Sequence, residues 1–408
     1  MFGLSTISSG SILSDVNLVS SNLGTSYVVL GSRSGENTQV TSSSDGIMMI
    51  QGDGGLKQEV LSRSTTNIGD ITGDGNDDWL IGDPGASRGY ILFGTSPRLS
   101  NVKPSVLITE TGEPQGPQSG LGWSSSGLGD INGDGYGDLI ISAPISNLVY
   151  VVYGRARRNF PSHLMLLRMS VHQGFKIVGS IGDRRFGVSV SSGGDFNGDG
   201  KRDMLIGGVA SSSSNQGVVY VVYGNGSVGI GGGGGGVWMD SLSNSSFFKI
   251  NTARSSFTGM SVSGLGDMNG DGLDDVGFGS APYQSSGSVQ STYVIYGRKT
   301  RENGSENMLS VAELRSGVDG FVVRGGGFMV AGLGDINGDG LSDMMVTNYG
   351  GWLGKGNGYI TVFPRNISSF PSLSPTSHPS ISSVPSFVPS SNPTLDETNF
   401  PTNSTSGQ

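Results

Sequence analysis

The sequence has no cysteine and few histidines. Without cysteine, the chain can form neither a disulfide framework nor a thiolate metal site, and redox chemistry says nothing about its compartment. Only three histidines occur, and His378 lies in a low-complexity segment near the end of the sequence. These absences exclude disulfide-stapled folds and cysteine-based zinc sites.

Long hydrophobic runs are also missing. No stretch approaches the roughly 18 consecutive apolar residues that a membrane helix needs, so the sequence predicts no membrane span in this chain. Residues 1–5 lack the basic region and apolar core of a secretory signal. We expect the amino terminus to be incomplete, which would explain the missing signal.

What the sequence does contain is one nine-residue acidic loop in five copies. Positions 1, 3, 5 and 9 offer side-chain oxygens, position 7 varies and would contribute only its carbonyl, and glycines at 4 and 6 allow a sharp turn. Three carboxylates so close together repel one another unless a divalent ion neutralises them. The pattern predicts a structural hard-cation site, with calcium as the expected ion, at residues 70–78, 130–138, 195–203, 267–275 and 335–343.

An EF-hand shares the first nine positions of this loop but differs at the twelfth. EF-hands need a bidentate glutamate there, together with flanking helices. The twelfth position here is always apolar, which predicts a strand entering the core in place of a ligand. The EF-hand interpretation is therefore excluded by Ile81, Ile141, Ile206, Phe278 and Val346.

The acidity of the chain follows from the same loops. The formal net charge is −9, and fifteen of the 33 acidic residues stand at positions 1, 5 and 9 of the loops. Five calcium ions would bring the charge to about +1. The acidity reflects metal demand, and we expect no nucleic-acid partner.

The spacing of the loops predicts the fold. Successive first aspartates lie 60, 65, 72 and 68 residues apart, and repeats longer than about 50 residues with several strands each are typical of propellers. The third copy shows four short strands, one blade, at 186–190, 204–207, 218–224 and 247–250. We expect one closed all-β domain, a β-propeller of four-stranded blades.

The third strand of the blade recurs most clearly. Its apolar character is continuous, which indicates that both faces of the sheet are covered. Six copies predict at least six blades, at 27–31, 90–94, 150–154, 220–224, 293–297 and 359–363.

The two ends of the sequence depart from the repeat. The predicted propeller covers residues 1–365, and residues 1–60 form a degenerate, truncated first blade without the acidic loop. Residues 366–408 are rich in Ser, Pro and Thr and cannot bury a core. This tail is either an O-glycosylated stalk or a plain disordered linker.

The repeated units, each an acidic loop with its four strands, resemble FG-GAP repeats, the units of the integrin alpha-subunit amino-terminal propeller. Phe186-Gly187 matches the first naming motif, and Ser142-Ala143-Pro144 and Ser280-Ala281-Pro282 match the second. The resemblance covers about residues 20–365. Integrins normally have seven blades, a membrane span, cysteines and, in some cases, an inserted ligand-binding domain, so the resemblance concerns the repeat rather than a whole integrin subunit.

The resemblance implies that each loop binds calcium between the first two strands of its blade. Thr72 replaces the usual Asn or Asp, so we expect the first of about five sites to be the weakest. In order of positions 1, 3, 5, 7 (through the carbonyl) and 9, the implied ligands are Asp70, Thr72, Asp74, Asn76 and Asp78; Asp130, Asn132, Asp134, Tyr136 and Asp138; Asp195, Asn197, Asp199, Lys201 and Asp203; Asp267, Asn269, Asp271, Leu273 and Asp275; and Asp335, Asn337, Asp339, Leu341 and Asp343.

The preferred functional hypothesis is a non-enzymatic, calcium-stabilised adhesion or recognition module. It would lie outside the cell or on its surface and present propeller loops to a protein or glycan ligand. The stalk-like tail favours this hypothesis, and so does the weak calcium affinity, typical of extracellular modules, that we expect of the loops. N-glycosylation sequons favour it as well, at Asn225, Asn244, Asn303, Asn366 and Asn403. No catalytic or cofactor-binding residue is assigned, and the oligomeric state is left open.

Two alternatives remain. The chain could be the non-catalytic propeller of a secreted hydrolase or polysaccharide lyase, since His163 and His172, in a segment expected to connect blades, are more simply surface residues than catalytic ones. The loops could instead be calcium sensors, but stacked blades leave little room for the opening that EF-hand sensors use. The glycine run at 231–236 is interpreted as a flexible loop.

Overall fold

The computed structural model divides into residues 1–372 and 373–408, and every residue that it describes belongs to the first unit. The predicted tail and the sixth third strand, 359–363, lie outside the described residues, as does most of the predicted first blade. The described residues are 25–29, 47–51, 64–94, 105–111, 118–180, 183–210, 217–224, 236–252, 256–282, 290–299, 307–324, 326–327 and 329–347.

Four sheets have the predicted order of four antiparallel strands. In chain order, the first contains β3 (Ser64–Gly69), β4 (Asp78–Asp83), β5 (Arg88–Leu92) and β6 (Val106–Thr109), and the second β7 (Ser125–Gly129), β8 (Asp138–Ala143), β9 (Leu148–Val152) and β11 (Gly174–Val178). The third contains β12 (Asp183–Gly194), β13 (Asp203–Ala210), β14 (Gly217–Val222) and β16 (Phe247–Asn251), and the fourth β17 (Ser256–Gly266), β18 (Asp275–Pro282), β19 (Ser291–Ile295) and β21 (Gly320–Arg324).

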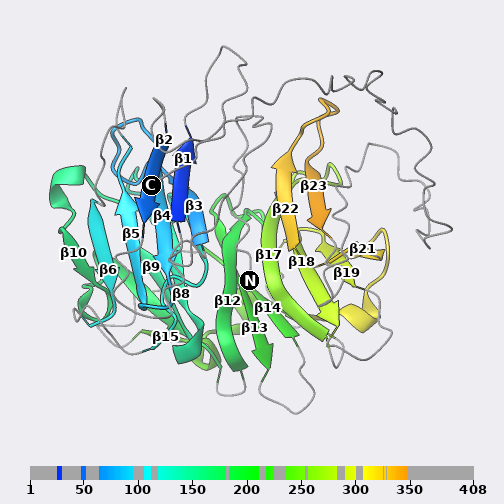
Figure 1. Ribbon diagram of the computed structural model, residues 1–408. Helices are drawn as coiled ribbons and strands as arrows, with labels where there is room; N and C mark the ends of the chain where they lie inside the picture. Colours follow the sequence, from blue (N-terminus) through cyan, green and yellow to red (C-terminus); the bar gives the residue numbers. More distant parts are fainter. Residues whose placement is uncertain are drawn as a thin grey trace, which may run out of the picture. The chain divides into compact units, whose positions relative to one another are not determined.

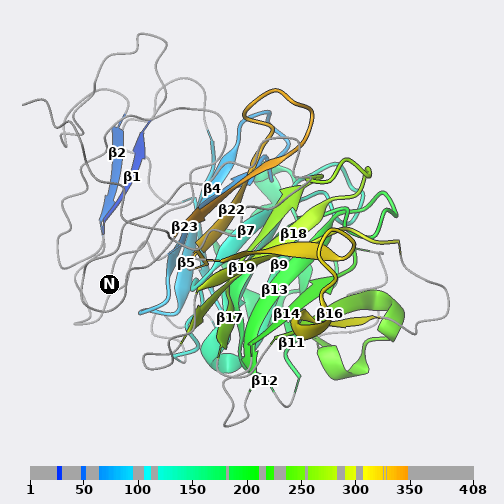
Figure 2. The ribbon, with the colours of Figure 1, turned by 90° about the vertical axis from the view of Figure 1, so that its right-hand side faces the viewer.

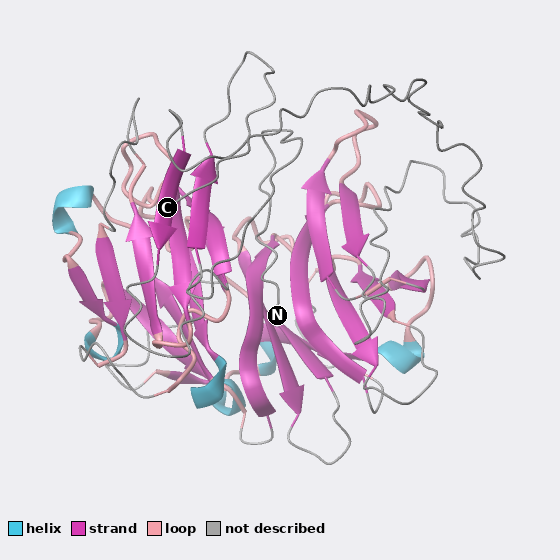
Figure 3. Cartoon of the chain, in the orientation of Figure 1, coloured by secondary structure: helices cyan, strands magenta, loops and turns pink. Residues whose placement is uncertain are grey.

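Two strand pairs complete the described sheets. They are β1 (Thr25–Val29) with β2 (Ile47–Gln51), and β22 (Met329–Gly334) with β23 (Asp343–Thr347). The described helices are short 3-10 turns (Figure 3), at η1 (Pro144–Ser146), η2 (Arg157–Asn159), η3 (Leu166–Arg168), η4 (Met239–Ser241), η5 (Asn244–Ser246) and η6 (Val311–Glu313). Among the described residues, no helix has the length and apolarity required to cross a membrane.

The third strands are shifted relative to the prediction. β5, β9 and β19 each begin two residues before the predicted tyrosine and end two residues before the predicted glycine. The reason lies at the glycine, whose N–H turns away from the ladder: the N–H of Gly94 donates to the Asp78 carboxylate at 2.7 Å, and that of Gly154 donates to Asp138 at 2.8 Å. The predicted burial of both faces is confirmed, since all residues of β14 are buried.

Three of the four sheets carry an additional strand that the sequence analysis missed. β10 (His163–Met165) pairs in parallel with β6, β15 (Val237–Trp238) with β11, and β20 (Met308–Ser310) with β16. Along the chain, each added strand comes between the third and fourth strands of the following sheet. It covers the outer edge of the preceding sheet, which would otherwise offer unpaired backbone groups.

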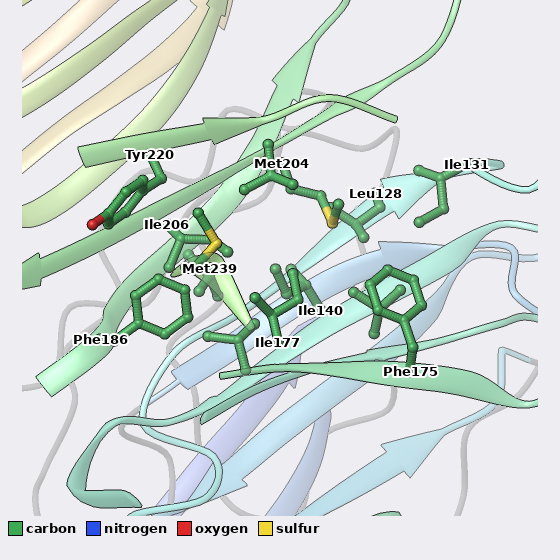
Figure 4. Close-up of a cluster of buried hydrophobic side chains, with 14 of the residues drawn as sticks. Leu128, Ile131, Ile140, Phe175, Ile177, Phe186, Met204, Ile206, Tyr220 and Met239 are labelled. Atoms are coloured by element: carbon green, nitrogen blue, oxygen red, sulfur yellow. The ribbon is translucent and has the colours of Figure 1, made fainter. Parts of the chain in front are cut away.

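The hydrophobic core lies between successive sheets. One cluster joins the second and third sheets through Leu128, Ile140, Phe175, Phe186, Ile206 and Tyr220 (Figure 4). Three further clusters have the same arrangement, one for each remaining pair of neighbours from the first sheet to β22–β23. Face-to-face packing therefore buries both faces of the inner sheets.

The first strands of successive sheets are in contact, from β3 through β7, β12 and β17 to β22. Figure 1 shows β12, β17 and β22 side by side, and Figure 2 shows the same strands after a turn of 90°. Repeated four-stranded antiparallel sheets, stacked face to face in chain order, are the blades of a β-propeller. The predicted fold class is confirmed, whereas the boundaries of the whole domain remain a prediction.

Candidate metal centres

All five acidic loops lie where they were predicted, between the first and second strands of a sheet. A β-bulge precedes each loop and places a glycine with positive φ opposite the aspartate of position 9. This glycine is of the type found at G1 bulges, because φ values of 67–74° are costly for other residues. This bulge was not predicted, although a glycine precedes position 1 in every copy, at Gly69, Gly129, Gly194, Gly266 and Gly334.

The glycines at positions 4 and 6 have the predicted turning role. In the second loop, Gly133 has φ 80° and Gly135 has φ 89°. All ten such glycines have positive φ, a conformation that a side chain with a Cβ adopts only with strain. The turn brings the backbone N–H groups of the loop toward the carboxylate of position 1.

The aspartate at position 1 accepts several of these N–H groups. Asp130 accepts from Gly133 at 2.7 Å, from Asp134 at 3.1 Å and from Gly135 at 2.8 Å. Burial tends to raise the pKa of Asp70, but four backbone donors outweigh it and lower that pKa. Donors led by Gly340 lower the pKa of Asp335 as well. In these two loops, the backbone donors therefore favour the ionised form of position 1 and orient it.

Positions 3 and 5 face each other. In the second loop, the amide Nδ2 of Asn132 donates to Asp134 at 3.0 Å, while its Oδ1 accepts from the Asp134 N–H at 2.9 Å. The third and fourth loops repeat both bonds. The amide nitrogen thus provides the partial positive charge that a cation would otherwise bring to position 5.

The aspartate at position 9 lies in a different environment from positions 1 and 5. In the first four loops it is fully buried. One carboxylate oxygen accepts the N–H of position 2 and the other accepts the N–H of the glycine after the third strand, as Asp203 does with Phe196 at 2.9 Å and with Gly224 at 3.0 Å. The same pair of bonds occurs at Asp78, Asp138 and Asp275.

Burial raises the pKa of these carboxyl groups strongly. The pKa of Asp78 is raised to about 6, and those of Asp138, Asp203 and Asp275 to about 7, with burial as the largest cause and the other loop aspartates adding repulsion. None of the four forms an ion pair with a described basic side chain. A buried carboxylate without such a partner is stabilised by a nearby cation.

The donor set of each loop fits calcium. Calcium prefers about six to eight oxygen ligands, which carboxylates, amide oxygens and backbone carbonyls supply. In the described part of the chain, no three acidic or histidine side chains already converge on a single point, because backbone and Asn N–H groups occupy the carboxylate oxygens. The 25 ligands therefore remain a proposal.

The first and fifth loops depart from the pattern. In the first, the Thr72 hydroxyl donates to Asp70 at 3.3 Å, and Arg157 from the next sheet lies 3.8 Å from Asp74. In the fifth, Ile336 is 56% exposed, whereas its counterpart Ile71 is 1% exposed. That the first site is the weakest stays a prediction.

The two histidines considered as catalytic candidates have structural surroundings. His163 lies in β10, and its Nε2 is 2.8 Å from the Thr109 hydroxyl of the preceding sheet. The segment was predicted to connect two blades, and this prediction is wrong. It lies within one blade, between β9 and β11. His172 is exposed in the turn before β11, and of the glycine run only Gly236 is described.

Comparisons with known proteins point to the same repeat. The FG-GAP repeat family matches residues 122–155 and 186–222, which span the second and third loops. Integrin alpha pat-2 of Caenorhabditis elegans is 28% identical over 229 residues, or 53% of this chain and 17% of that protein. Integrin alpha-5 of Xenopus laevis is 26% identical over 243 residues, or 57% of this chain and 20% of that protein.

One relative of another kind also matches. Phosphatidylinositol-glycan-specific phospholipase D of Mus musculus is 33% identical over 120 residues, which are 27% of this chain and 14% of that protein. The chain thus matches a fifth or less of the length of each of these three relatives. The likeness concerns the repeats and leaves the remainder of those proteins unmatched.

Proposed function

Because this chain carries FG-GAP repeats and is homologous to integrin alpha subunits, we propose that it is a calcium-stabilised adhesion or recognition module outside the cell. Calcium ions bind the five loops and hold the ends of the blades rigid. The propeller loops then present a surface to a protein or glycan ligand. In this proposal the chain has no catalytic residues of its own.

The observation that carries the calcium part is the buried aspartate of position 9. Asp138, Asp203 and Asp275 are each fully buried and bear a strongly raised pKa. Other aspartates of the same loop repel their charged forms. A divalent cation offsets both the burial of the charge and the mutual repulsion. The backbone already positions the oxygens, so binding requires little reorganisation of the strands.

The adhesion part rests on homology to integrin alpha subunits and on the exposed loops. Four of the five position-5 aspartates are exposed, so ions can enter from solvent. Asn244, within an N-glycosylation sequon, is exposed in η5, which suits an extracellular chain. The oligomeric state is not assigned.

A binding assay tests this proposal. The protein is immobilised and exposed to extracellular-matrix proteins, glycans and intact cells, in calcium and after chelation. The matched control replaces all five position-5 aspartates with asparagine, which keeps side-chain size while removing five charges. We expect binding in calcium that is lost both after chelation and in the variant. Failure of every surface to bind the calcium-loaded protein, or binding that survives chelation, would contradict the proposal.

A second candidate is favoured by the match to the phospholipase. In this case the chain is the propeller portion of a secreted hydrolase. Because this portion would itself be non-catalytic, the test is release of a glycosylphosphatidylinositol-anchored reporter from membranes by the full gene product that carries this chain. The adhesion proposal predicts no release by that product, and measurable release would favour the enzyme.

A further inference from the structure

The acidic loops of neighbouring sheets touch one another. At three of the four junctions, the backbone N–H of position 8 donates to the carbonyl of position 1 in the preceding loop. These bonds run from Gly137 to Asp70 at 3.0 Å, from Asp274 to Asp195 at 3.3 Å, and from Ser342 to Asp267 at 2.9 Å. The loops therefore form a row in which each one supports its predecessor.

The side chain of position 7 contributes to the same junctions. It covers the position-4 glycine of the preceding loop so closely that a Cβ at Gly73 would lie 2.7 Å from the Tyr136 ring. A Cβ at Gly198 would lie 2.7 Å from Leu273, and one at Gly270 would lie 3.1 Å from Leu341. Position 7 thus has two separable features: a carbonyl for its own loop and a side chain for the preceding one.

The junction between the second and third loops lacks both contacts. Position 7 is Lys201 there, and a Cβ at Gly133 would meet nothing within 4 Å. Among the described backbone hydrogen bonds, none joins Arg202 to Asp130. Among the described residues, the flexible side chain of Arg202 approaches this junction, 2.7 Å from a Cβ built at Gly129, and residue 225, which follows the third-strand glycine, lies outside them.

Further bonds strengthen two of the connected junctions. The N–H of Arg155 donates to the Ile71 carbonyl at 2.9 Å, and the N–H of Arg298 donates to the Phe196 carbonyl at 2.8 Å. At this second junction, between loops 3 and 4, the Asp195 N–H also donates to the Asp274 carboxylate at 2.7 Å. The contacts divide the row into a pair, loops 1 and 2, and a triplet, loops 3 to 5.

We propose that ion binding is cooperative within the pair and within the triplet, and independent between them. The proposal rests on the calcium binding proposed above. An ion restricts the remaining motion of positions 1 to 9 of its loop, and the more rigid positions 7 and 8 then hold positions 1 and 4 of the preceding loop in place. The preceding loop spends less conformational entropy when its own ion binds. By linkage, the effect acts equally in both directions.

Calcium titrations followed by hydrogen exchange at each loop test the proposal. Asp271→Asn removes a charged ligand from loop 4 alone. We expect the calcium midpoints of loops 3 and 5 to rise about fivefold or more, while those of loops 1 and 2 stay within about twofold. Asp134→Asn should raise the midpoint of loop 1 and leave loops 3 to 5 unchanged.

A second set of variants keeps every ligand atom in place. Tyr136→Ala and Leu273→Ala retain the position-7 carbonyl and remove only the contact with the preceding loop, so each should raise the midpoint of that loop. Lys201→Ala is the matched comparison at the junction without contact, and it should leave the midpoint of loop 2 unchanged. Thermal melts in calcium establish that each variant is folded.

The outcomes separate the two proposals. If no loop of the unmodified protein gains protection with calcium, calcium binding itself is wrong. If all loops gain protection but Asp271→Asn and Leu273→Ala leave the midpoint of loop 3 unchanged, calcium binding stands and the coupling is wrong. Equal effects of Lys201→Ala and Leu273→Ala on the preceding loops would also overturn the division into pair and triplet.

Discussion

The interfaces between sheets and the acidic loops at the sheet ends are held together in different ways. Between the second and third sheets, side chains such as Ile140, Ile177 and Ile206 are fully buried against one another. In the loop that precedes Ile140 along the chain, Asp138 is just as buried but carries an ionisable group. The first region needs only its own side chains, whereas the function proposed above adds a cation to the second.

This difference predicts two separable contributions to stability. Burial of apolar area stabilises the stacked sheets in water, with or without calcium. On the calcium binding proposed above, the loops contribute when the ion offsets the repulsion among positions 1, 5 and 9. Removing calcium should therefore weaken the ends of the sheets first, while changes in the core should act equally with and without calcium.

Chelation is expected to have the largest effect. At a free calcium concentration ten times the dissociation constant, each site stabilises the folded state by about 1.4 kcal/mol, so five sites contribute about 7 kcal/mol. Thermal melts with calcium and with a chelator measure the change as a large fall in Tm. Magnesium should restore less than calcium because it demands a tighter octahedral shell. An unchanged Tm after chelation would remove the proposed role of the ion.

A cavity in the core should cost less and should not depend on calcium. Phe278 is fully buried between the third and fourth sheets and stacks on Tyr293 with ring centroids 5.3 Å apart. Phe278→Ala is expected to lower the free energy of unfolding by about 3–5 kcal/mol. Denaturant titrations in calcium and in chelator should give the same loss. A loss confined to one of the two conditions would show that core and loops are not separable.

Removing one exposed loop charge should, in contrast, change the stability mainly when calcium is present. Asp199 is exposed and accepts the Lys201 N–H at 2.9 Å. Asp199→Asn should lower the free energy of unfolding by about 1–2 kcal/mol in calcium, since one site is weakened. In chelator, the change should stay within about 0.5 kcal/mol, as for other surface substitutions. Equal losses in both conditions would assign Asp199 a purely structural role.

A pH dependence of the calcium-free protein is also predicted. The pKa values of Asp138, Asp203 and Asp275 are about 7 in the folded state, against about 3.9 when unfolded. Between these values the folded state binds more protons, so its stability is fully present below about pH 4 and is lost as the pH rises through 7.

The calcium-free protein should therefore melt at a higher temperature at pH 5 than at pH 8. In saturating calcium the order should reverse, because protons compete with the ion for the same carboxylates. Melting curves at both pH values, with and without calcium, provide the four measurements. A calcium-free Tm that rises with pH would contradict the burial of these charges.

Much of the fold could be predicted from the sequence because it is repeated. Five loops in register identified the hairpins, and the apolar third strands, such as 220–224, identified the sheets. The start of β14 at Gly217 could not be predicted, because pairing with β13 and β16 rather than local hydrophobicity decides where a strand begins. The added parallel strands were missed for the same reason, since the pairing of Val237–Trp238 with the preceding sheet is a tertiary contact.

The candidate sites were predictable in composition and less so in environment. Local turn chemistry explains why Gly133 and Gly135 could be assigned from sequence. The burial of Asp138 could not, because its second hydrogen-bond partner, Gly154, lies 16 residues away, after the third strand. The contact of Tyr136 with Gly73 depends on how two sheets stack, and no local pattern encodes it.

The most direct test of the account is the number of calcium ions that the protein binds. Equilibrium dialysis against calcium, with metal analysis of the retained protein, measures this number without assuming a fold change or a ligand. We expect five ions per chain, with dissociation constants on the order of 10⁻⁴ to 10⁻³ M and with the ion of the Thr72 loop lost first on dilution. A protein that retains no calcium at millimolar free concentration would contradict it.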